Sequence, residues 1–423
     1  MLTKLKPKSE FTKNVLTLMT GTTIAQAIPI AISPILTRLY TPEDFGVLSL
    51  YTSIVAIFAS FVTGRFELAL MIPKSRKVVY FLFIIGLSLS IFFSLLIFFF
   101  IFIFHDKFLN IINNEELSIW LYFVPLSVFL LSLFNLLNYF NSKIKLYKDI
   151  SKAKVVRSFS VSIVQIILGI FHFASNGLII GQIISQFFAN SKLILNIKPL
   201  VSKINIKKLF LLILKYKHFP TIAMFSMLLG VLFQHISNIL ISTVFSIQVL
   251  GYYALIQRVL GVPSSLIGTS IGQVFYQNIS DKKNNLFEVK KIFYNTMNKL
   301  FLIAIPIYFT IYFISPYLFG FVFGEEWIKT GEYAQILIPF IFIRFIVSPL
   351  DFLYNLYGHL HLELLWRLFV LLGTVCVFYI SYLLKLDFIL FLKIYSSFLV
   401  ISYLISLIIL LLIVNSKIKR KKI

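Results

Sequence analysis

Residues 78–104 read VVYFLFIIGLSLSIFFSLLIFFFIFIF, a run that contains no charged residue. A helix that spans a bilayer needs about 20 mostly apolar residues, so this run by itself predicts a transmembrane helix. The whole chain shares its character, because 59% of the 423 residues are hydrophobic and only 13% are charged. Soluble domains are about half apolar and about a quarter charged, so the chain is expected to be a membrane protein.

Eleven other stretches have a similar length and apolar character. The sequence therefore predicts an all-α polytopic membrane protein with about twelve transmembrane helices. The predicted spans are residues 14–36, 46–65, 78–104, 117–141, 155–173, 176–196, 219–244, 250–276, 295–319, 332–356, 363–384 and 388–414.

The formal net charge of +23 is spread unevenly over the connections between these spans. Connections rich in Lys and Arg alternate with poor ones, as the positive-inside rule requires for twelve helices with both termini in the cytoplasm. The exception is the connection 357–362, which carries His359 and His361 but no Lys or Arg. One rich connection is taken to include Lys143, Lys145, Lys148, Lys152, Lys154 and Arg157. Most of the charge is thus expected to report topology, and the chain has too little polar surface for a nucleic-acid partner.

Several classes of site are excluded by what the sequence lacks. It has no Gly-rich phosphate loop, no Walker lysine motif and no paired carboxylates arranged for glycosyl transfer. The single Cys376 excludes a multi-cysteine metal site. The poor connections are short and leave no room for an extracytoplasmic catalytic domain. We therefore expect no enzyme activity, no metal and no bound cofactor.

A weak internal repeat relates the two halves of the chain. The segment Arg38–Gly46 aligns with Thr243–Gly251 at an offset of 205, so that Thr41 meets Ser246. The basic stretch 197–218 divides the predicted spans six and six. We therefore predict an N-terminal lobe at 1–196, a basic cytoplasmic linker at 197–218 and a C-terminal lobe at 219–423. An even number of spans in each half makes the repeats parallel, with two six-helix lobes around a central cavity.

Polar residues within the spans are expensive and usually face the interior of the bundle. The candidates for lining a cavity are Gln26 in the first span, Asn238 in the seventh, Thr269 in the eighth and Asn355 in the tenth. For such residues, hydrogen bonding between neighbouring helices is the alternative explanation.

Charged residues inside spans point more strongly to function. Arg258 and Arg344 lie well within their spans, where we expect them to bind an anionic ligand. Asp351 shares a helical face with Arg344 at a spacing of seven residues, so it is either a partner for an arginine or a titrating group in ion coupling. Glu363 and Arg367, four residues apart, are expected to pair with each other.

Three segments near the N-terminus carry a family resemblance. Residues 18–29 read LMTGTTIAQAIP, residues 34–46 read PILTRLYTPEDFG and residues 64–74 read GRFELALMIPK. Together they resemble the N-terminal signature of the O-antigen and capsular-polysaccharide flippases. These flippases belong to the multidrug/oligosaccharidyl-lipid/polysaccharide (MOP) exporter superfamily, which also holds the multidrug and toxin extruders. Within the matched stretch Arg38, Arg65 and Glu67 gain functional interest, although their places near span ends also fit snorkelling.

The resemblance implies a function and a location. It implies a flippase in the bacterial cytoplasmic (inner) membrane that moves undecaprenyl-pyrophosphate-linked oligosaccharide units from the inner to the outer leaflet. The product would be a surface polysaccharide, either the O-antigen of lipopolysaccharide or a capsule. The resemblance further implies alternating access of the two lobes, driven by a H⁺ or Na⁺ gradient. The expected partners are the lipid-linked oligosaccharide, membrane lipids and the polysaccharide polymerase machinery.

The residue chemistry agrees with an anionic lipid substrate, because the fixed charge and forked donors of arginine suit a pyrophosphate. Two alternatives stay open. A cation-coupled multidrug exporter of the same superfamily would favour acidic residues in its cavity, whereas here arginines outnumber acids within the spans. A membrane glycosyltransferase or polymerase would be expected to show clustered catalytic acids.

Overall fold

The computed structural model describes residues 10–112, 114–200 and 206–415 of the chain. Two sets of predicted cytoplasmic residues lie outside the described residues: part of the linker, 201–205, and basic residues at the chain ends, among them Lys4, Lys6, Lys8 and 417–422. Across the described residues the secondary structure is helical, and twelve helices are long and apolar enough to cross a membrane. The prediction of an all-α, multi-pass membrane protein with twelve spans is confirmed.

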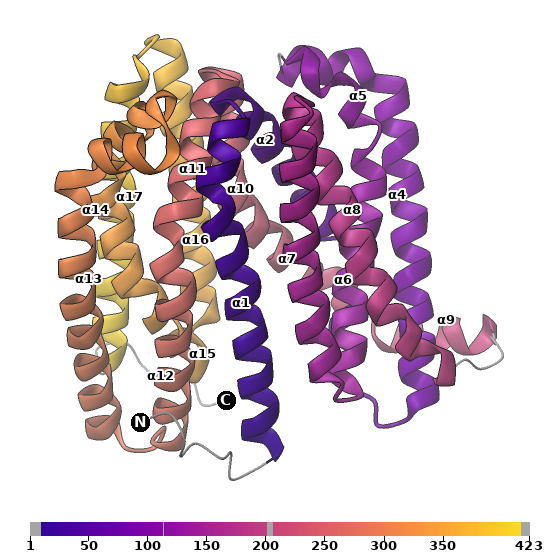
Figure 1. The fold of residues 1–423 in the computed structure, drawn as a ribbon. Helices are drawn as coiled ribbons and strands as arrows, with labels where there is room; N and C mark the ends of the chain where they lie inside the picture. The colour runs from indigo at the N-terminus through magenta and orange to yellow at the C-terminus, as the bar shows by residue number, and fades with distance from the viewer. Residues whose placement is uncertain (1–9, 113, 201–205, 416–423) are drawn as a thin grey trace. The chain divides into compact units, whose positions relative to one another are not determined.

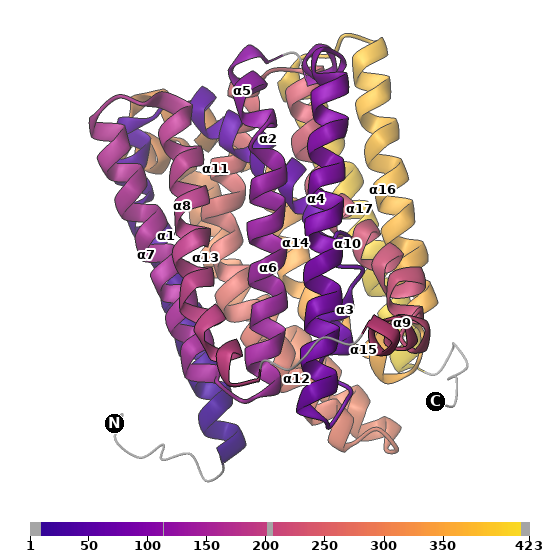
Figure 2. The ribbon, with the colours of Figure 1, turned by 90° about the vertical axis from the view of Figure 1, so that its right-hand side faces the viewer.

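The chain divides into two compact units, Met1–Thr243 and Val244–Ile423. The first unit includes the seventh span, α10. The predicted division into two lobes of six spans each, at 1–196 and 219–423, stays a prediction. The helices of the first unit (Figures 1 and 2) are α1 Glu10–Leu39, α2 Pro42–Ala59, α3 Phe66–Ala69, α4 Arg76–Ile112, η1 Glu115–Leu117, α5 Ser118–Leu121, α6 Val124–Lys143, α7 Tyr147–Ile170, α8 Ala174–Ile194, η2 Leu195–Leu200, α9 Ile206–Lys215, η3 Phe219–Ala223 and α10 Met224–Val244.

The second unit is organised around one buried helix, α14. This helix packs against α11, α13 and α17, and more than half of its residues are buried, because it is apolar on nearly every side. The helices of this unit are α11 Ile247–Pro263, η4 Ser264–Gly268, α12 Thr269–Asp281, α13 Leu286–Phe323, η5 Glu325–Trp327, α14 Ile328–Val347, η6 Ser348–Leu350, α15 Phe352–Leu356, α16 Leu360–Leu383 and α17 Phe388–Val414.

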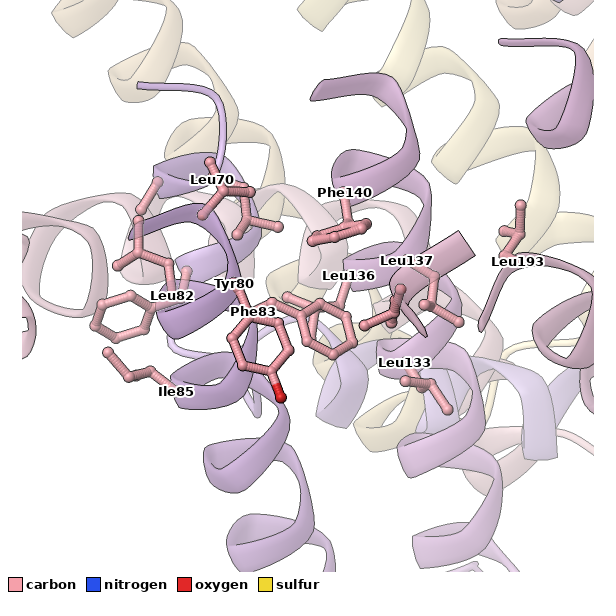
Figure 3. Packing of buried hydrophobic residues seen from close by; sticks show 14 of the residues in the cluster. Leu70, Tyr80, Leu82, Phe83, Ile85, Leu133, Leu136, Leu137, Phe140 and Leu193 are labelled. Atoms are coloured by element: carbon pink, nitrogen blue, oxygen red, sulfur yellow. The ribbon is translucent and has the colours of Figure 1, made fainter. Parts of the chain in front are cut away.

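The first unit has a hydrophobic core centred on α4 and α6 (Figure 3). The Phe83 ring of α4 meets the Phe140 ring of α6 edge to face, with centroids 5.3 Å apart, a geometry that aromatic pairs favour. Leu193 of α8 closes the cluster on one side (Figure 3). These contacts link spans that are separated by many residues in sequence, so the unit is stabilised by packing between helices.

The family-like segment Arg38–Gly46 forms a tight corner between α1 and α2. The side chain of Thr41 accepts a hydrogen bond from the Asp44 backbone N–H, and the Asp44 carboxylate accepts one from the Thr41 backbone N–H. This reciprocal capping box fixes the start of α2. At the aligned position in the second unit, Ser246 caps α11 by accepting from the Val249 backbone N–H. The predicted repeat therefore reflects a shared helix cap.

Tyr40 anchors the same corner to α7 and α8. Its ring fills a slot beside Gly169 and Gly177, where a Cβ atom would lie 2.8 Å from the ring and 2.5 Å from the hydroxyl. The hydroxyl donates a hydrogen bond of 2.7 Å to the Gln165 carbonyl. Burial, together with the nearby Asp44 carboxylate, raises the pKa of Tyr40 to about 12. The phenol is therefore protonated at neutral pH and able to donate.

We predict that Tyr40→Phe lowers the free energy of unfolding by about 1 kcal/mol, because the buried Gln165 carbonyl loses its donor. The apparent unfolding temperature of the purified protein in detergent measures the effect. The control is Tyr379→Phe, which removes the hydroxyl of an exposed tyrosine. Equal unfolding temperatures for the two variants would contradict an anchoring role for Tyr40.

Candidate functional site

The second unit contains a cavity of about 300 Å³ where the α11–α12 helix pair meets the end of α14. Its walls combine one arginine with hydroxyl, amide and aromatic groups, and none of its described lining residues is acidic. The lining residues are Ser264, Gly268, Thr269, Gln273, Arg344, Phe345, Ser348, Pro349 and Phe352. The cavity therefore has a largely apolar wall that carries one positive charge and a few hydroxyl and amide groups.

The α-helix on one side of the cavity is interrupted at Pro263. Proline has no N–H and its ring crowds the preceding turn of a helix, and α11 ends at Pro263 in a π-helical turn, η4. Beyond it, Gly272 lets α12 approach η6 closely, since a Cβ there would lie 3.4 Å from the Pro349 backbone. π-Helical turns often occur at functional sites, and this one places Ser264 in the cavity wall.

Arg344 provides the positive charge of the cavity. It is half-buried, and its guanidinium lies 5.9 Å from the centroid of the Phe340 ring on the preceding turn of α14. The three ion pairs among the described residues do not include it. The hydroxyl-bearing residues Ser264, Thr269 and Ser348 line the cavity together with it. A half-buried arginine that shares a cavity with hydroxyl groups, and has no carboxylate partner among the described residues, is suited to binding an anion.

An apolar groove of about 350 Å³ lies beside the cavity, between α13 and α14. Tyr308 stands between the two spaces, because it lines the groove and its ring centroid is 5.8 Å from that of Phe345 in the cavity wall. The other groove residues are Ile305, Phe309, Tyr312, Phe313, Ile338, Pro339 and Phe342. The cavity that holds Arg344 and the apolar groove are thus neighbours, joined by the contact between Tyr308 and Phe345.

Asp351 lies just beyond the cavity, in the turn between η6 and α15. Its Oδ1 atom is buried and has no hydrogen-bond partner. No ion pair among the described residues joins it to Arg344, although the two are only seven residues apart in the sequence. Glu363 and Arg367 act on it electrostatically. These two pair with each other at 2.5 Å, which confirms the pairing expected from their spacing.

Of the residues proposed from the sequence in this unit, Arg344 and Thr269 come together in the cavity. The hydroxyl of Thr269 also donates to the Ser265 carbonyl. Arg258 is half-buried on α11, five residues before Pro263, and is not among the lining residues. Asn355 is exposed on α15 and does not line the cavity either.

In the first unit, Arg65 and Glu67 belong to a tight turn. Gly64 and Arg65 both have positive φ angles, 57° and 58°. Arg65 Nη1 donates to Glu67 Oε1 at 2.8 Å, and Thr63 Oγ1 donates to Glu67 Oε2 at 2.6 Å. Both carboxylate oxygens of Glu67 are therefore engaged within the turn.

The two residues of α1 that were predicted as site residues, Arg38 and Gln26, are both exposed. Arg38 donates to the Pro34 carbonyl of its own helix at 3.3 Å. Gln26 is exposed on α1. No described cavity brings either one together with the Arg65–Glu67 turn.

Asn238 belongs to a polar cluster that sequence patterns did not reveal. Asn238 Nδ2 donates to Ser53 Oγ at 2.8 Å, and His235 Nδ1 lies 3.2 Å from the same oxygen. Ser53 Oγ donates its own proton to the Ser49 carbonyl at 2.7 Å. The His235 contact therefore requires a proton on Nδ1. The cluster joins α2 to α10, and the separation of 182 residues between Ser53 and His235 left no local signal.

Four basic residues that were assigned to one cytoplasmic connection lie within the helix α7: Lys148, Lys152, Lys154 and Arg157. Lys154 and Arg157 were assigned to a cytoplasmic connection, but α7 begins at Tyr147 and both are half-buried in it. Lys154 Nζ donates to Thr22 Oγ1 at 3.1 Å. The Arg157 guanidinium lies 5.3 Å from the Phe134 ring centroid. Partners on neighbouring helices allow these charges inside the helix, and the sequence around them does not reveal those partners.

Metal-binding groups do not cluster in the part of the chain that the structure describes, where no three His, Cys, Asp or Glu side chains could hold one ion.

Comparison with known proteins gives a family and a fold. The profile of the family described as "polysaccharide biosynthesis protein" matches residues 35–332, whereas no curated protein sequence matches the chain. The fold is similar to that of the lipid II flippase MurJ in an inward closed conformation, with a TM-score of 0.71, 15% identity, and 96% of this chain and 94% of that one covered.

Two transporters of the MOP superfamily have similar folds as well. An inward-facing multidrug resistance transporter of the MATE family aligns with a TM-score of 0.62 and 13% identity, over 95% of this chain and 94% of that one. A MOP superfamily transporter from Pyrococcus furiosus aligns with a TM-score of 0.58 and 13% identity, over 96% of both chains. At these identities the likeness concerns the fold.

Proposed function

Because the chain belongs to the polysaccharide biosynthesis protein family, we propose that it is a flippase for an undecaprenyl-pyrophosphate-linked oligosaccharide. It would carry this lipid from the inner to the outer leaflet of the bacterial cytoplasmic membrane for surface polysaccharide assembly. The fold shared with a lipid II flippase supports the reaction class, and the alternating Lys and Arg distribution supports cytoplasmic termini.

The observation that carries the proposal is Arg344 in a hydroxyl-lined cavity without an acidic lining residue. A guanidinium binds phosphate oxygens through two parallel charge-assisted hydrogen bonds. The nearby hydroxyls of Ser264 and Ser348 can donate to further oxygens of a pyrophosphate or of the first sugar. The same lining disfavours a cationic drug, because that substrate would meet a positive charge with no carboxylate to balance it.

The groove beside the cavity suits the rest of an amphiphilic substrate. A polyprenyl chain is apolar, and the groove is lined by aromatic and aliphatic side chains on α13 and α14. With the pyrophosphate beside Arg344, the first isoprene units would pass Tyr308 into the groove. The remaining tail would stay in the bilayer.

Filling the groove tests this placement. We predict that Ile305→Trp lowers the transfer rate by about tenfold, since an indole would occupy the space for the lipid chain. Leu302→Trp is the matched control, because Leu302 is exposed on the same helix one turn earlier and does not line the groove. Transfer of a fluorescent lipid-linked oligosaccharide in liposomes is the measurement, and equal rates for the two variants would contradict the tail position.

We assign ion coupling to Asp351. Its buried Oδ1 lacks a partner, so a proton or Na⁺ would satisfy it. Glu67 is the weaker candidate, because both of its oxygens are occupied by Thr63 and Arg65.

Reconstitution tests the function as a whole. The purified chain in liposomes that contain a labelled lipid-linked oligosaccharide should transfer the label between leaflets, and an ion gradient should accelerate the transfer. A chain that transports ethidium-like cations but not the lipid-linked sugar would be an exporter. A chain that converts the lipid-linked sugar chemically would be an enzyme.

A further inference from the structure

The ten-residue helix α9 differs from every predicted span. Its sequence, IKKLFLLILK, is far shorter than the roughly 20 residues needed to cross a bilayer. It lies between the sixth and seventh spans, and Figures 1 and 2 show it beside the lower part of α4. A short helix tied to two neighbouring spans stays near the end of the bundle, where the bilayer surface is.

One face of α9 fastens it to the first unit. Leu209 and Leu212 pack against the core cluster of α4, α6 and α8, and Tyr216 just beyond the helix belongs to that cluster. Because α9 rests on this core, its orientation follows that of the first unit.

A second face is apolar and uncovered. Ile206, Phe210 and Leu214 are 80%, 61% and 51% exposed. With 3.6 residues per turn, these three project from one side of the helix. Large exposed apolar side chains side by side mark a contact surface for protein or membrane.

The third face is basic. Lys208 and Lys215, seven residues apart, lie on one side, and Lys207 borders the apolar face. No acidic residue occurs in the helix. An apolar face beside lysines is the pattern of helices that lie in the interface of anionic membranes.

We propose that α9 is a membrane-surface helix that binds the anionic phospholipids of the leaflet it faces. Phe210 and its neighbours would enter the acyl region by about 5–10 Å, while the three lysines contact headgroup phosphates. Charge complementarity favours lipid over a protein partner, since an anionic leaflet offers both phosphate and hydrocarbon to one helix. The inference is independent of the transported substrate.

Tryptophan reporters in the full-length protein test the depth of α9. Phe210→Trp and its control Lys208→Trp place an indole on opposite faces of the helix. The three native tryptophans are buried and supply a constant background: Trp120, Trp327 and Trp366. In liposomes of phosphatidylcholine and phosphatidylglycerol, lipids with brominated acyl chains should quench the Phe210→Trp emission at least about twofold more than the Lys208→Trp emission. Aqueous acrylamide should give the reverse order.

The charge preference is measured with the same Phe210→Trp reporter. Brominated phosphatidylglycerol should quench it at least about threefold more than brominated phosphatidylcholine, because each lysine near an anionic surface adds about fivefold in affinity. Changing Lys207, Lys208 and Lys215 to Gln should bring this ratio close to one. The same change at Lys282, Lys283 and Lys290 in the second unit is the control and should leave the ratio unchanged.

Two outcomes overturn the proposal. Equal quenching of the two reporters by brominated lipid would mean that α9 does not enter the membrane and that its apolar face serves a protein partner. A ratio of one in the parent protein would mean that the lysines do not select anionic lipid. Phe210 is exposed, so its replacement is not expected to disturb folding.

Discussion

Replacing Arg344 with alanine is expected to lower the transfer of a lipid-linked oligosaccharide between leaflets by at least about tenfold. Hydrogen bonds to a charged group contribute about 1.5–3 kcal/mol, and Arg344 is the one positively charged residue among those that line the described cavity. Removing it would leave a pyrophosphate in the cavity with uncharged hydroxyl and amide partners alone. The rate of transfer in liposomes measures the loss, and complementation of a flippase-null strain provides a second readout.

Two further variants separate the effect of charge from that of geometry. Arg344→Lys keeps the charge but loses the planar fork, so transfer should be intermediate between wild type and alanine. Lys393→Ala is the control, because it removes a positive charge from an exposed position in another span, α17. We expect it to transfer at nearly the wild-type rate.

Arg258 is the second arginine assigned to substrate binding. It does not line the cavity, so Arg258→Ala tests whether its charge acts on the substrate from α11. Loss of transfer in Arg344→Ala alone would confine the site to the described cavity. Full activity of both alanine variants at normal expression would reject an arginine-based substrate site.

The largest stability effect is expected for Gly331→Ala. Gly331 lies in the first turn of α14 directly against α13, where a Cβ would be 2.4 Å from Pro316 Cα and 2.5 Å from the Ser315 carbonyl oxygen. Both are backbone atoms and cannot rotate away. The same contact carries a hydrogen bond of 2.8 Å from Ser315 Oγ to the Gly331 carbonyl. Adding one methyl group must separate the helices, at a cost of about 1–3 kcal/mol or more.

Gly261 offers a matched control for the same substitution. It lies within α11, and a Cβ there meets no heavy atom within 4 Å. Alanine is about 1 kcal/mol better than glycine within a helix, so Gly261→Ala should be neutral or slightly stabilising. The yield of monodisperse protein and its apparent unfolding temperature should fall for Gly331→Ala only. Equal behaviour of the two variants would show that α13 and α14 can move apart at little cost.

Local patterns were enough to predict the spans and the ion pair between Glu363 and Arg367. Hydrophobic length identified twelve helices, and a spacing of four residues identified the Glu363–Arg367 pair. The same reasoning was incomplete for Asp351 and Arg344. Their spacing of seven residues predicts a shared helical face, but they form no ion pair among the described residues. The short 3-10 helix η6, which contains Pro349, interrupts the α-helix between them.

Positive charge inside a span was harder to predict than apolar length. Lys154 was counted as part of a connection because a lysine usually ends a predicted span. Its hydrogen bond to Thr22 on α1 keeps the ammonium group satisfied within α7. A partner 132 residues away leaves no trace in the residues around Lys154.

The sequence by itself determined that this chain is a multi-pass helical membrane protein with a polysaccharide-flippase signature, because span length and helix caps depend on residues close together in the chain. Only the tertiary structure decided which polar residues meet. It gave Tyr40 of the signature a packing role between α7 and α8, closed Arg65 and Glu67 into a turn, and placed Arg344 in a cavity beside Thr269. The physical reason is that a polar side chain in a bilayer takes its partner from a neighbouring helix or a nearby turn, and packing between distant segments selects that partner.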